Sequence, residues 1–145
     1  GAFVGLHTSH GRAEMFRAVL EGGAFAIRAI FEQVQGWCGE PTVVRFTGSG
    51  ATSPLWSQMI VDVLRHPVEA TDGAVEARGA AMYLAVALGI YADIDEAGAA
   101  MVQVSQVLEP EAANADRYDS LYADWQRVNE AMRPLDEREL RTGHL

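Results

Sequence analysis

The sequence predicts an α/β domain that is rich in helix and contains a small sheet. Two short runs, 43–46 and 68–70, have the composition and length of strands, and each is followed by a segment in which apolar residues recur at helical spacing. Apolar residues make up 49% of the 145 residues. That share is enough to bury the core of one ordinary domain.

The expected elements follow in order along the chain. They are an extended segment or strand at 1–6, a helix at 12–35, a buried strand at 43–46, a helix at 54–64, a strand at 68–70, and helices at 74–88, 95–102 and 113–132. Pro67 ends the helix before it, because proline disfavours helical backbone in the residue that precedes it. The residues 133–145 form a polar tail that we expect to fray, so the domain proper spans 1–132.

The first and last helices carry most of the expected core. In the first, Gly22-Gly23 indicates close backbone packing against a neighbour, and Gly36 and Gly39 are expected to end the helix. The last helix has an aromatic and apolar stripe that we interpret as core. Its members are Tyr118, Leu121, Tyr122, Trp125, Val128 and Met132.

The segment Gly48-Ser49-Gly50 lies at the turn between the strand 43–46 and the helix 54–64. Glycine lacks a Cβ atom, so backbone N–H groups at this turn can approach a ligand closely. Ser53 has the side chain of a helix N-cap, and Pro54 fits the first helical turn. The positive end of the helix points at the same place, so the turn suits a phosphate group, and Gly50 is expected to need a positive φ.

Other interpretations of this turn stay open on these residues alone. The glycines can serve only the steric needs of a tight turn. The spacing of Gly48, Gly50 and Ser53 comes close to the dinucleotide-binding fingerprint, and Glu69 lies where a ribose-binding acid would stand. Serine at the third position and the lack of further strand–helix–strand units weigh against that interpretation. A non-catalytic nucleotide-binding or interaction module is an alternative from a different class of protein.

Three motifs, in one order along the chain, resemble those of the FGGY carbohydrate kinases. The first joins a glycine–apolar–glycine–apolar strand end to an acid-started helix, and its matching residues are Gly1, Phe3, Gly5, Leu6, Glu14, Met15, Ala18, Val19, Leu20 and Glu21. The second, Gly48-Ser-Gly-Ala-Thr-Ser-Pro-Leu-Trp56, resembles the family's adenosine segment, with Ser49 in place of its usual middle glycine. The third, Glu76-Ala-Arg-Gly-Ala-Ala81, resembles the small-residue helix that follows. The resemblance covers roughly 1–110.

The resemblance implies a fold and a reaction. These kinases have the ribonuclease H-like core of actin-like ATPases, and they phosphorylate a sugar hydroxyl with ATP and Mg²⁺. The Ser-Pro-Leu-Trp pattern favours a ketopentose such as xylulose as the acceptor, followed by glycerol or a related polyol. By resemblance, the residues that line the α-phosphate and ribose side of the nucleotide are Gly48, Ser49, Gly50 and Ala51. Ser53 and Pro54 would shape the adenosine pocket.

The chain opens inside the first motif, and no segment of it resembles the family's phosphate loop, sugar-binding residues or catalytic aspartate. We therefore expect the catalytic aspartate, most Mg²⁺ ligands and the sugar site to lie N-terminal to Gly1, so that the domain at 1–132 is incomplete at its N-terminus. The chain would then supply the ATP-binding half of the enzyme. By itself it is expected to be inactive on sugars.

Composition excludes several other classes of protein. A net charge of −9 is unsuited to nucleic acid or to an anionic membrane surface. The apolar runs fall short of the ~20 residues of a membrane span. Cys38 is the lone cysteine, which fits a reducing cytoplasm and a small apolar role. His7 and His10 are assigned to a connecting loop rather than to a metal, and a homodimer is left open.

Overall fold

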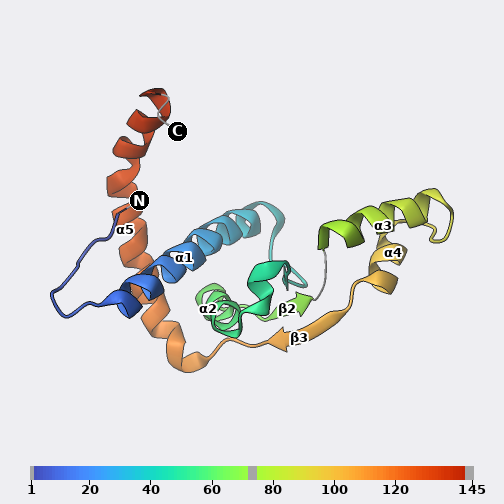
Figure 1. Cartoon of the computed structure of the whole chain (residues 1–145), viewed down its shortest axis with the longest axis horizontal. Helices are drawn as coiled ribbons and strands as arrows, with labels where there is room; N and C mark the ends of the chain where they lie inside the picture. The colour runs from blue at the N-terminus through green and yellow to red at the C-terminus, as the bar shows by residue number, and fades with distance from the viewer. Residues whose placement is uncertain (1, 72–74, 143–145) are drawn as a thin grey trace.

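The computed structural model describes residues 2–71 and 75–142. In order along the chain, the elements are α1 (Arg12–Cys38), β1 (Arg45–Phe46), the 3₁₀ turn η1 (Ser49–Thr52), α2 (Pro54–Leu64), β2 (Val68–Thr71), α3 (Val75–Ala87), α4 (Ile94–Met101), β3 (Val104–Leu108) and α5 (Ala112–Thr142). Helices α1, α2 and α5 gather in one body, the strands extend from it, and α3 with α4 lies at the opposite end (Figure 1). The prediction of a helix-rich α/β domain with a small sheet is confirmed.

Helix α1 forms where the apolar periodicity predicted it, and it runs unbroken through Gly22-Gly23. At its start, the backbone N–H of Gly11 donates to the Glu14 carboxylate at 2.8 Å, which satisfies one of the unpaired groups near a helix end. At its end, Gly39 has φ 80° and ψ −172°. This backbone conformation is essentially restricted to glycine. The expectation that Gly36 also ends the helix is wrong, because Gly36 lies inside it.

The core lies where α1, α2 and α5 pack together. Its buried members are Ala24, Phe25, Met59, Ile60, Val63, Tyr118 and Tyr122. The Phe25 and Tyr118 rings meet edge to face with 6.3 Å between centroids, and Tyr122 stacks on Trp125 at 5.9 Å. Such aromatic pairs add to the stability that burial alone provides. The expectation that the aromatic stripe of the last helix belongs to the core is therefore confirmed for Tyr118, Leu121, Tyr122 and Trp125, whereas Val128 and Met132 lie outside this cluster.

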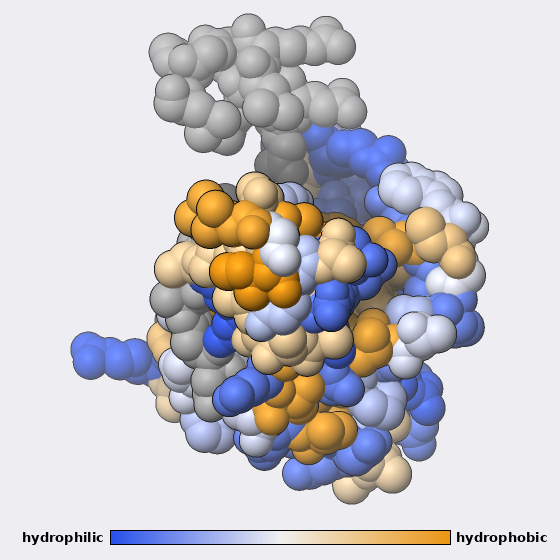
Figure 2. Space-filling model, turned by 90° about the vertical axis from the view of Figure 1, so that its right-hand side faces the viewer, coloured by the Kyte–Doolittle hydropathy of each residue, from blue (hydrophilic) through white to orange (hydrophobic). Residues whose placement is uncertain are grey.

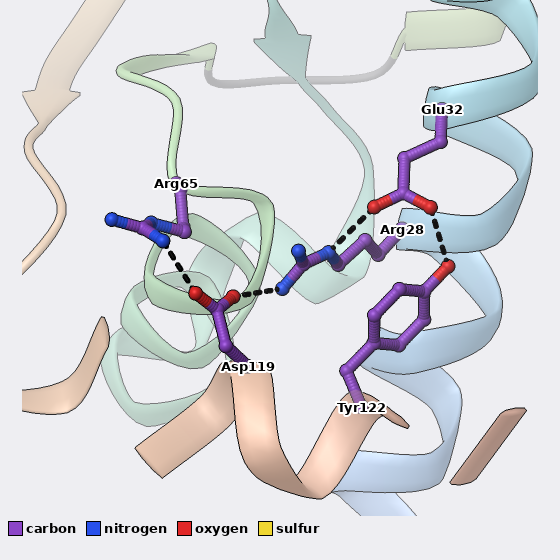
Figure 3. A network of polar contacts seen from close by, with 5 residues as sticks. All are labelled: Arg28, Glu32, Arg65, Asp119 and Tyr122. Atoms are coloured by element: carbon purple, nitrogen blue, oxygen red, sulfur yellow. Dashed lines mark hydrogen bonds and ion pairs between the residues drawn. The ribbon is translucent and has the colours of Figure 1, made fainter. Parts of the chain in front are cut away.

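A polar network fastens the same three helices to one another (Figure 3). Arg28 on α1 donates to Asp119 on α5 at 2.7 Å and to Glu32 at 2.9 Å, and its guanidinium lies 4.3 Å from the centre of the Tyr122 ring. Arg65, directly after α2, pairs with the other oxygen of Asp119. The Tyr122 hydroxyl donates to Glu32 at 2.8 Å. The hydrogen bond from Arg28 holds the pKa of Asp119 below its ordinary value.

The sheet has three strands in the order β1-β2-β3. Strand β1 runs parallel to β2, with Phe46 opposite Ala70, and the connection between them is α2. Strand β3 runs antiparallel to β2, with Val68 opposite Leu108 and an irregularity between Ala70 and Thr71. The elements η1 and α2 therefore follow the end of a parallel strand, which is a common position for ligand sites in α/β proteins.

Two strand predictions need correction. The buried strand expected at 43–46 pairs only at Arg45–Phe46, and Val43 is 42% exposed. Burial of a strand depends on its neighbours, and among the described residues β1 has a single neighbour, β2. Strand β3 was not predicted at all. Its sequence, Val-Ser-Gln-Val-Leu, lacks a clean alternation of apolar and polar residues, so its own pattern does not identify it as a strand.

Helices α3 and α4 form a hairpin that packs on itself at the far end of the molecule (Figure 1). The methyl carbon of Met82 would lie 3.5 Å from a Cβ atom placed on Gly98, so the two helices meet over a small residue. Figure 2, which views this end of the molecule, shows hydrophobic side chains on its surface. The large exposed ones in this segment are Tyr83, Leu84, Leu88, Ile90 and Ile94.

Helix α5 continues beyond its expected end at Met132 and reaches Thr142, with Pro134 inside it. The segment 133–142 therefore has helical backbone, and the helix end expected at Met132 is wrong, while the fraying of the polar tail stays a prediction. The end was misplaced because the residues after Met132 are polar and do not continue the apolar stripe. A domain boundary at 132 stays a prediction.

Candidate functional site

The glycine turn between β1 and α2 has a backbone that its sequence explains. Gly48 has φ 84° and ψ −171°, which is close to the backbone conformation of Gly39 and essentially restricted to glycine. The chain then forms the 3₁₀ turn η1, in which the N–H of Ala51 donates to the carbonyl of Gly48 at 3.1 Å. The N–H of Ser53 donates to the carbonyl of Gly50 at 3.2 Å. Gly48 thus reverses the chain, and η1 holds the turn compact.

Helix α2 begins directly after this turn, as predicted. Ser53 is its N-cap with extended backbone, and its hydroxyl accepts from the N–H of Trp56 at 3.4 Å. Pro54 occupies the first position of the helix, where a missing N–H costs nothing. The positive end of the eleven-residue helix therefore lies beside the glycine turn. In the part of the chain that the structure describes, the N–H groups of Ser49 and Gly50 have no hydrogen-bond partner.

Gly50 is required for a different reason from the one its sequence suggested. Its φ lies outside the positive range, so the positive φ expected at Gly50 is found at Gly48 instead. A Cβ atom placed on Gly50 would lie 3.0 Å from Cζ of Phe46 and 3.1 Å from Nε1 of Trp56. Those separations are tighter than most real Cβ contacts, so a ring would have to shift slightly to admit a side chain. Glycine is favoured at this position because two aromatic rings crowd the space of a side chain.

A groove of about 570 Å³ runs along one side of the turn, between η1 with the start of α2 and the strands β2 and β3. Its lining residues are Ala51, Thr52, Pro54, Ser57, Gln58, Ala70, Ser105, Gln106 and Leu108. Of the six residues predicted for the site, Ala51 and Pro54 line this groove, whereas Gly48, Ser49, Gly50 and Ser53 form the turn beside it. The volume is in the range of ordinary small-molecule sites.

The groove is polar without being charged. Its lining contains no acidic or basic side chain of the described residues. The hydroxyls of Ser57 and Ser105 donate to the carbonyls of Ala51 and Ala70, at 3.3 and 3.0 Å, and so help to fix the two walls. The amide of Gln58 donates to the carbonyl of Glu109 at 3.0 Å. Such a lining can bind a neutral polar ligand through hydrogen bonds, and it offers no group for acid–base chemistry.

Besides Thr52 in η1, sequence reasoning missed four polar residues of this groove: Ser57, Gln58, Ser105 and Gln106. The first two follow Pro54 by one helical turn, so helical spacing alone places them on the same side as Pro54. The last two lie on β3, and that strand was not predicted. The sequence therefore contained a signal for half of these residues.

Asp62 lies below the groove and is buried, yet its surroundings give it a structural role. Its carboxylate accepts from the Gln58 amide at 2.8 Å, from the Glu111 N–H at 2.8 Å and from the Asn114 amide at 2.7 Å. A buried carboxylate with this many donors is fully satisfied. Asp62 therefore joins α2 to the start of α5, with both of its oxygens hydrogen-bonded.

Other candidate sites are weaker. Glu69, the acid of the dinucleotide interpretation, is engaged by Arg45 across the β1–β2 pair at 2.9 Å. A hollow of about 690 Å³ between the N-terminal segment and α5 is lined largely by apolar groups, and its charged residues include Asp124 and Arg127, which pair with each other. Within residues 2–71 and 75–142, no three His, Cys, Asp or Glu side chains are grouped as a metal site would require.

No helix among the described residues has the length and apolar content to cross a membrane.

Comparison with known proteins shows which family the chain is similar to. The C-terminal domain of the FGGY family of carbohydrate kinases matches residues 1–88. The chain is 26% identical over 136 residues to a xylulose kinase of Staphylococcus epidermidis, covering 93% of this chain and 27% of that protein. It is 32% identical over 127 residues to an uncharacterised sugar kinase of Escherichia coli, covering 83% and 25%. The crystal structure of a xylulose kinase from Rhodospirillum rubrum superimposes with a TM-score of 0.79 at 30% identity, covering 92% and 28%.

The fold and these likenesses define the class first: the chain has the ribonuclease H-like fold of actin-like ATPases. More closely, it belongs to the FGGY family of carbohydrate kinases and matches their C-terminal domain. The chain spans about a quarter of the length of the relatives it matches.

Proposed function

We propose that this chain is the nucleotide-binding half of an ATP-dependent carbohydrate kinase. The observation that carries the proposal is the glycine turn at the start of α2. It has a glycine-only backbone at Gly48, two unpartnered N–H groups at Ser49 and Gly50, and a neutral polar groove beside it. Backbone N–H groups at a helix start suit phosphate, and an uncharged groove suits a nucleoside.

In this proposal, the α-phosphate and ribose lie against Gly48, Ser49, Gly50 and Ala51. The adenosine would lie along Ser53 and Pro54, beside Gln106 and the side-chain oxygens of Ser57, Gln58 and Ser105, which can still accept hydrogen bonds. These residues bind and orient ATP, and Mg²⁺, when bound, would neutralise phosphate charge. Positioning and charge stabilisation supply most of the rate in phosphoryl transfer. The domain therefore contributes to catalysis although the described residues hold no catalytic acid or base at the turn.

The acceptor that we propose is a sugar hydroxyl, with a ketopentose such as xylulose as the first candidate. Support comes from the relatives and structures that are named xylulose kinases. Glycerol or another polyol is the second candidate. The acceptor is tested on a protein that carries this domain together with the rest of the family's length. The measurement compares kcat/KM for xylulose, gluconate and glycerol. A reaction of this kind is expected in the cytoplasm, where ATP is available.

Calorimetric titration of the 145-residue chain with Mg·ADP and, separately, with NAD⁺ tests the nucleotide assignment. The proposal predicts saturable binding of Mg·ADP and a much weaker response to NAD⁺. Equal binding of both would favour a dinucleotide site. Binding of neither would favour the interaction module and would overturn the proposal.

A further inference from the structure

The indole of Trp56 spans the space between two glycines that are far apart in the sequence. A Cβ atom placed on Gly23 of α1 would lie 3.2 Å from Cη2, on the six-membered ring of Trp56. A Cβ atom placed on Gly50 would lie 3.1 Å from Nε1 and 3.2 Å from Cδ1, on the five-membered ring. One edge of the indole therefore abuts α1, and another abuts the glycine turn.

The neighbouring glycine in α1 shows that this contact is specific to position 23. No heavy atom lies within 4 Å of a Cβ placed on Gly22, whereas a Cβ on Gly23 would press on the indole. Glycine inside a helix costs roughly 1 kcal/mol relative to alanine. The approach of Trp56 explains why a glycine stands at position 23 despite this cost. It does not explain the glycine at position 22.

The row of contacts continues past the turn into the sheet. The same Cβ atom placed on Gly50 would also lie 3.0 Å from Cζ of Phe46, which belongs to β1. Trp56 and Phe46 both pack against the buried core of the three helices. Close-packed rings transmit displacement because their contacts leave no space to absorb it. A movement of α1 against Trp56 must therefore move the turn at Gly50.

We propose that Trp56 is a positioning residue for nucleotide binding, acting as a rigid spacer between α1 and the glycine turn. This inference rests on the proposed function, because it assumes that the turn binds the nucleotide. The N–H groups of the turn can bind phosphate only at the position that the spacer sets. A side chain on either Gly23 or Gly50 would then press on the indole that lies between them. Trp56 itself makes no contact with the reacting atoms.

Alanine at the two adjacent glycines of α1 gives a matched test in the 145-residue chain. Gly23→Ala should press on Trp56 and shift the backbone amide resonances of residues 48–53. It should also weaken Mg·ADP binding by about three- to tenfold, since small misplacements at a site are costly. Gly22→Ala makes the same helix-favouring change with free space around it. It should leave both the amide resonances and the affinity unchanged within about twofold.

Trp56→Phe removes the six-membered ring edge that faces Gly23 and completes a double-mutant cycle. In that background, Gly23→Ala should no longer shift the resonances of the turn, because the spacer is gone. The proposal is overturned if Gly23→Ala leaves the turn unchanged, if Gly22→Ala shifts it equally, or if the effect of Gly23→Ala persists in the Trp56→Phe background. If the unmodified chain fails to bind Mg·ADP, the proposed function falls. The amide resonances then still decide whether Trp56 couples α1 to the turn.

Discussion

Gly48 and Gly50 are two residues apart, and they are glycines for unrelated physical reasons. Gly48 has a backbone conformation that other residues rarely adopt, and no heavy atom lies near its Cβ position. Gly50 lacks a positive φ, but a Cβ atom there would crowd the rings of Phe46 and Trp56. Replacement of Gly50 by valine would therefore disrupt the packing of the turn as well as any ligand contact. A substitution at Gly48 therefore tests nucleotide binding by the turn without this disruption of packing.

Gly48→Ala and Gly39→Ala make a matched pair because the two glycines have nearly the same backbone angles and equally open surroundings. Each substitution should lower the free energy of unfolding by about 1–3 kcal/mol, the cost of a strained backbone. Only Gly48→Ala should also weaken Mg·ADP binding, since Gly39 lies at the far end of α1. Denaturant unfolding and calorimetry measure the two effects. Equal losses of Mg·ADP affinity in both variants would contradict the assignment of the nucleotide site to this turn.

Tyr122 gives the fold a dependence on alkaline pH. Burial, together with its hydrogen bond to Glu32, raises the pKa of Tyr122 to about 12 from an ordinary value near 10. The folded state keeps the phenol proton that the unfolded state has already lost at these pH values. The stability that the folded state gains from the raised pKa of Tyr122 is therefore complete below pH ~10, and it is lost as the pH rises towards ~12.

Tyr122→Phe should remove this loss, so its unfolding free energy should fall less steeply between pH ~10 and ~12 than that of the unmodified chain. Tyr83→Phe is the control, because Tyr83 is exposed on α3. Denaturant midpoints measured across this pH range give the slopes. Identical slopes for Tyr122→Phe and the unmodified chain would contradict the assignment.

At the scale of elements, local chemistry predicted helices better than strands. The bounds of α2 follow from Ser53 and Pro54 at its start and from Pro67 after its end, because each acts on the backbone next to it. Strand β3 could not be found from its own residues, since its pairing with β2 depends on the whole fold. The lining of the groove shows the same difference between helices and strands. Ala51 and Pro54, beside the start of α2, were predicted, whereas Ser105 and Gln106 on β3 were not.

Ser53→Ala tests the start of α2, and Asp93→Ala is its counterpart at α4. Ser53 accepts from the Trp56 N–H at 3.4 Å, and Asp93 accepts from the Glu96 N–H at 2.9 Å. Each loss of a cap should cost about 1 kcal/mol of stability. Only Ser53→Ala should also weaken Mg·ADP binding, and modestly, because α2 and not α4 begins at the glycine turn. A larger loss of affinity in Asp93→Ala would place the nucleotide on the α3–α4 hairpin instead.

At the scale of the molecule, α1 has a second apolar stripe that is exposed. Its exposed members are Phe16, Val19, Ile30, Val34 and Trp37, the last of them 80% exposed. Their spacing makes a row along the helix. An apolar surface of this extent favours association.

We expect the 145-residue chain to associate with itself as its concentration rises, through this stripe. Replacing Ile30 and Trp37 together by glutamine should reduce the association measured by light scattering. Leu88→Gln, an exposed apolar residue of the α3–α4 hairpin, is the control and should change it little. A monomer at all concentrations, or equal effects of the two changes, would contradict this expectation.

The central claim is that the turn at residues 48–54 binds the nucleotide. A titration of the isotopically labelled chain with Mg·ADP, followed by the backbone amide resonances, tests it most directly. The account predicts that the resonances that shift most belong to residues 48–53, with smaller changes at Ser57, Gln58, Ser105 and Gln106 along the groove. NAD⁺ should cause little change at the same residues. Saturable shifts that centre on another surface, with the turn unaffected, would contradict the account.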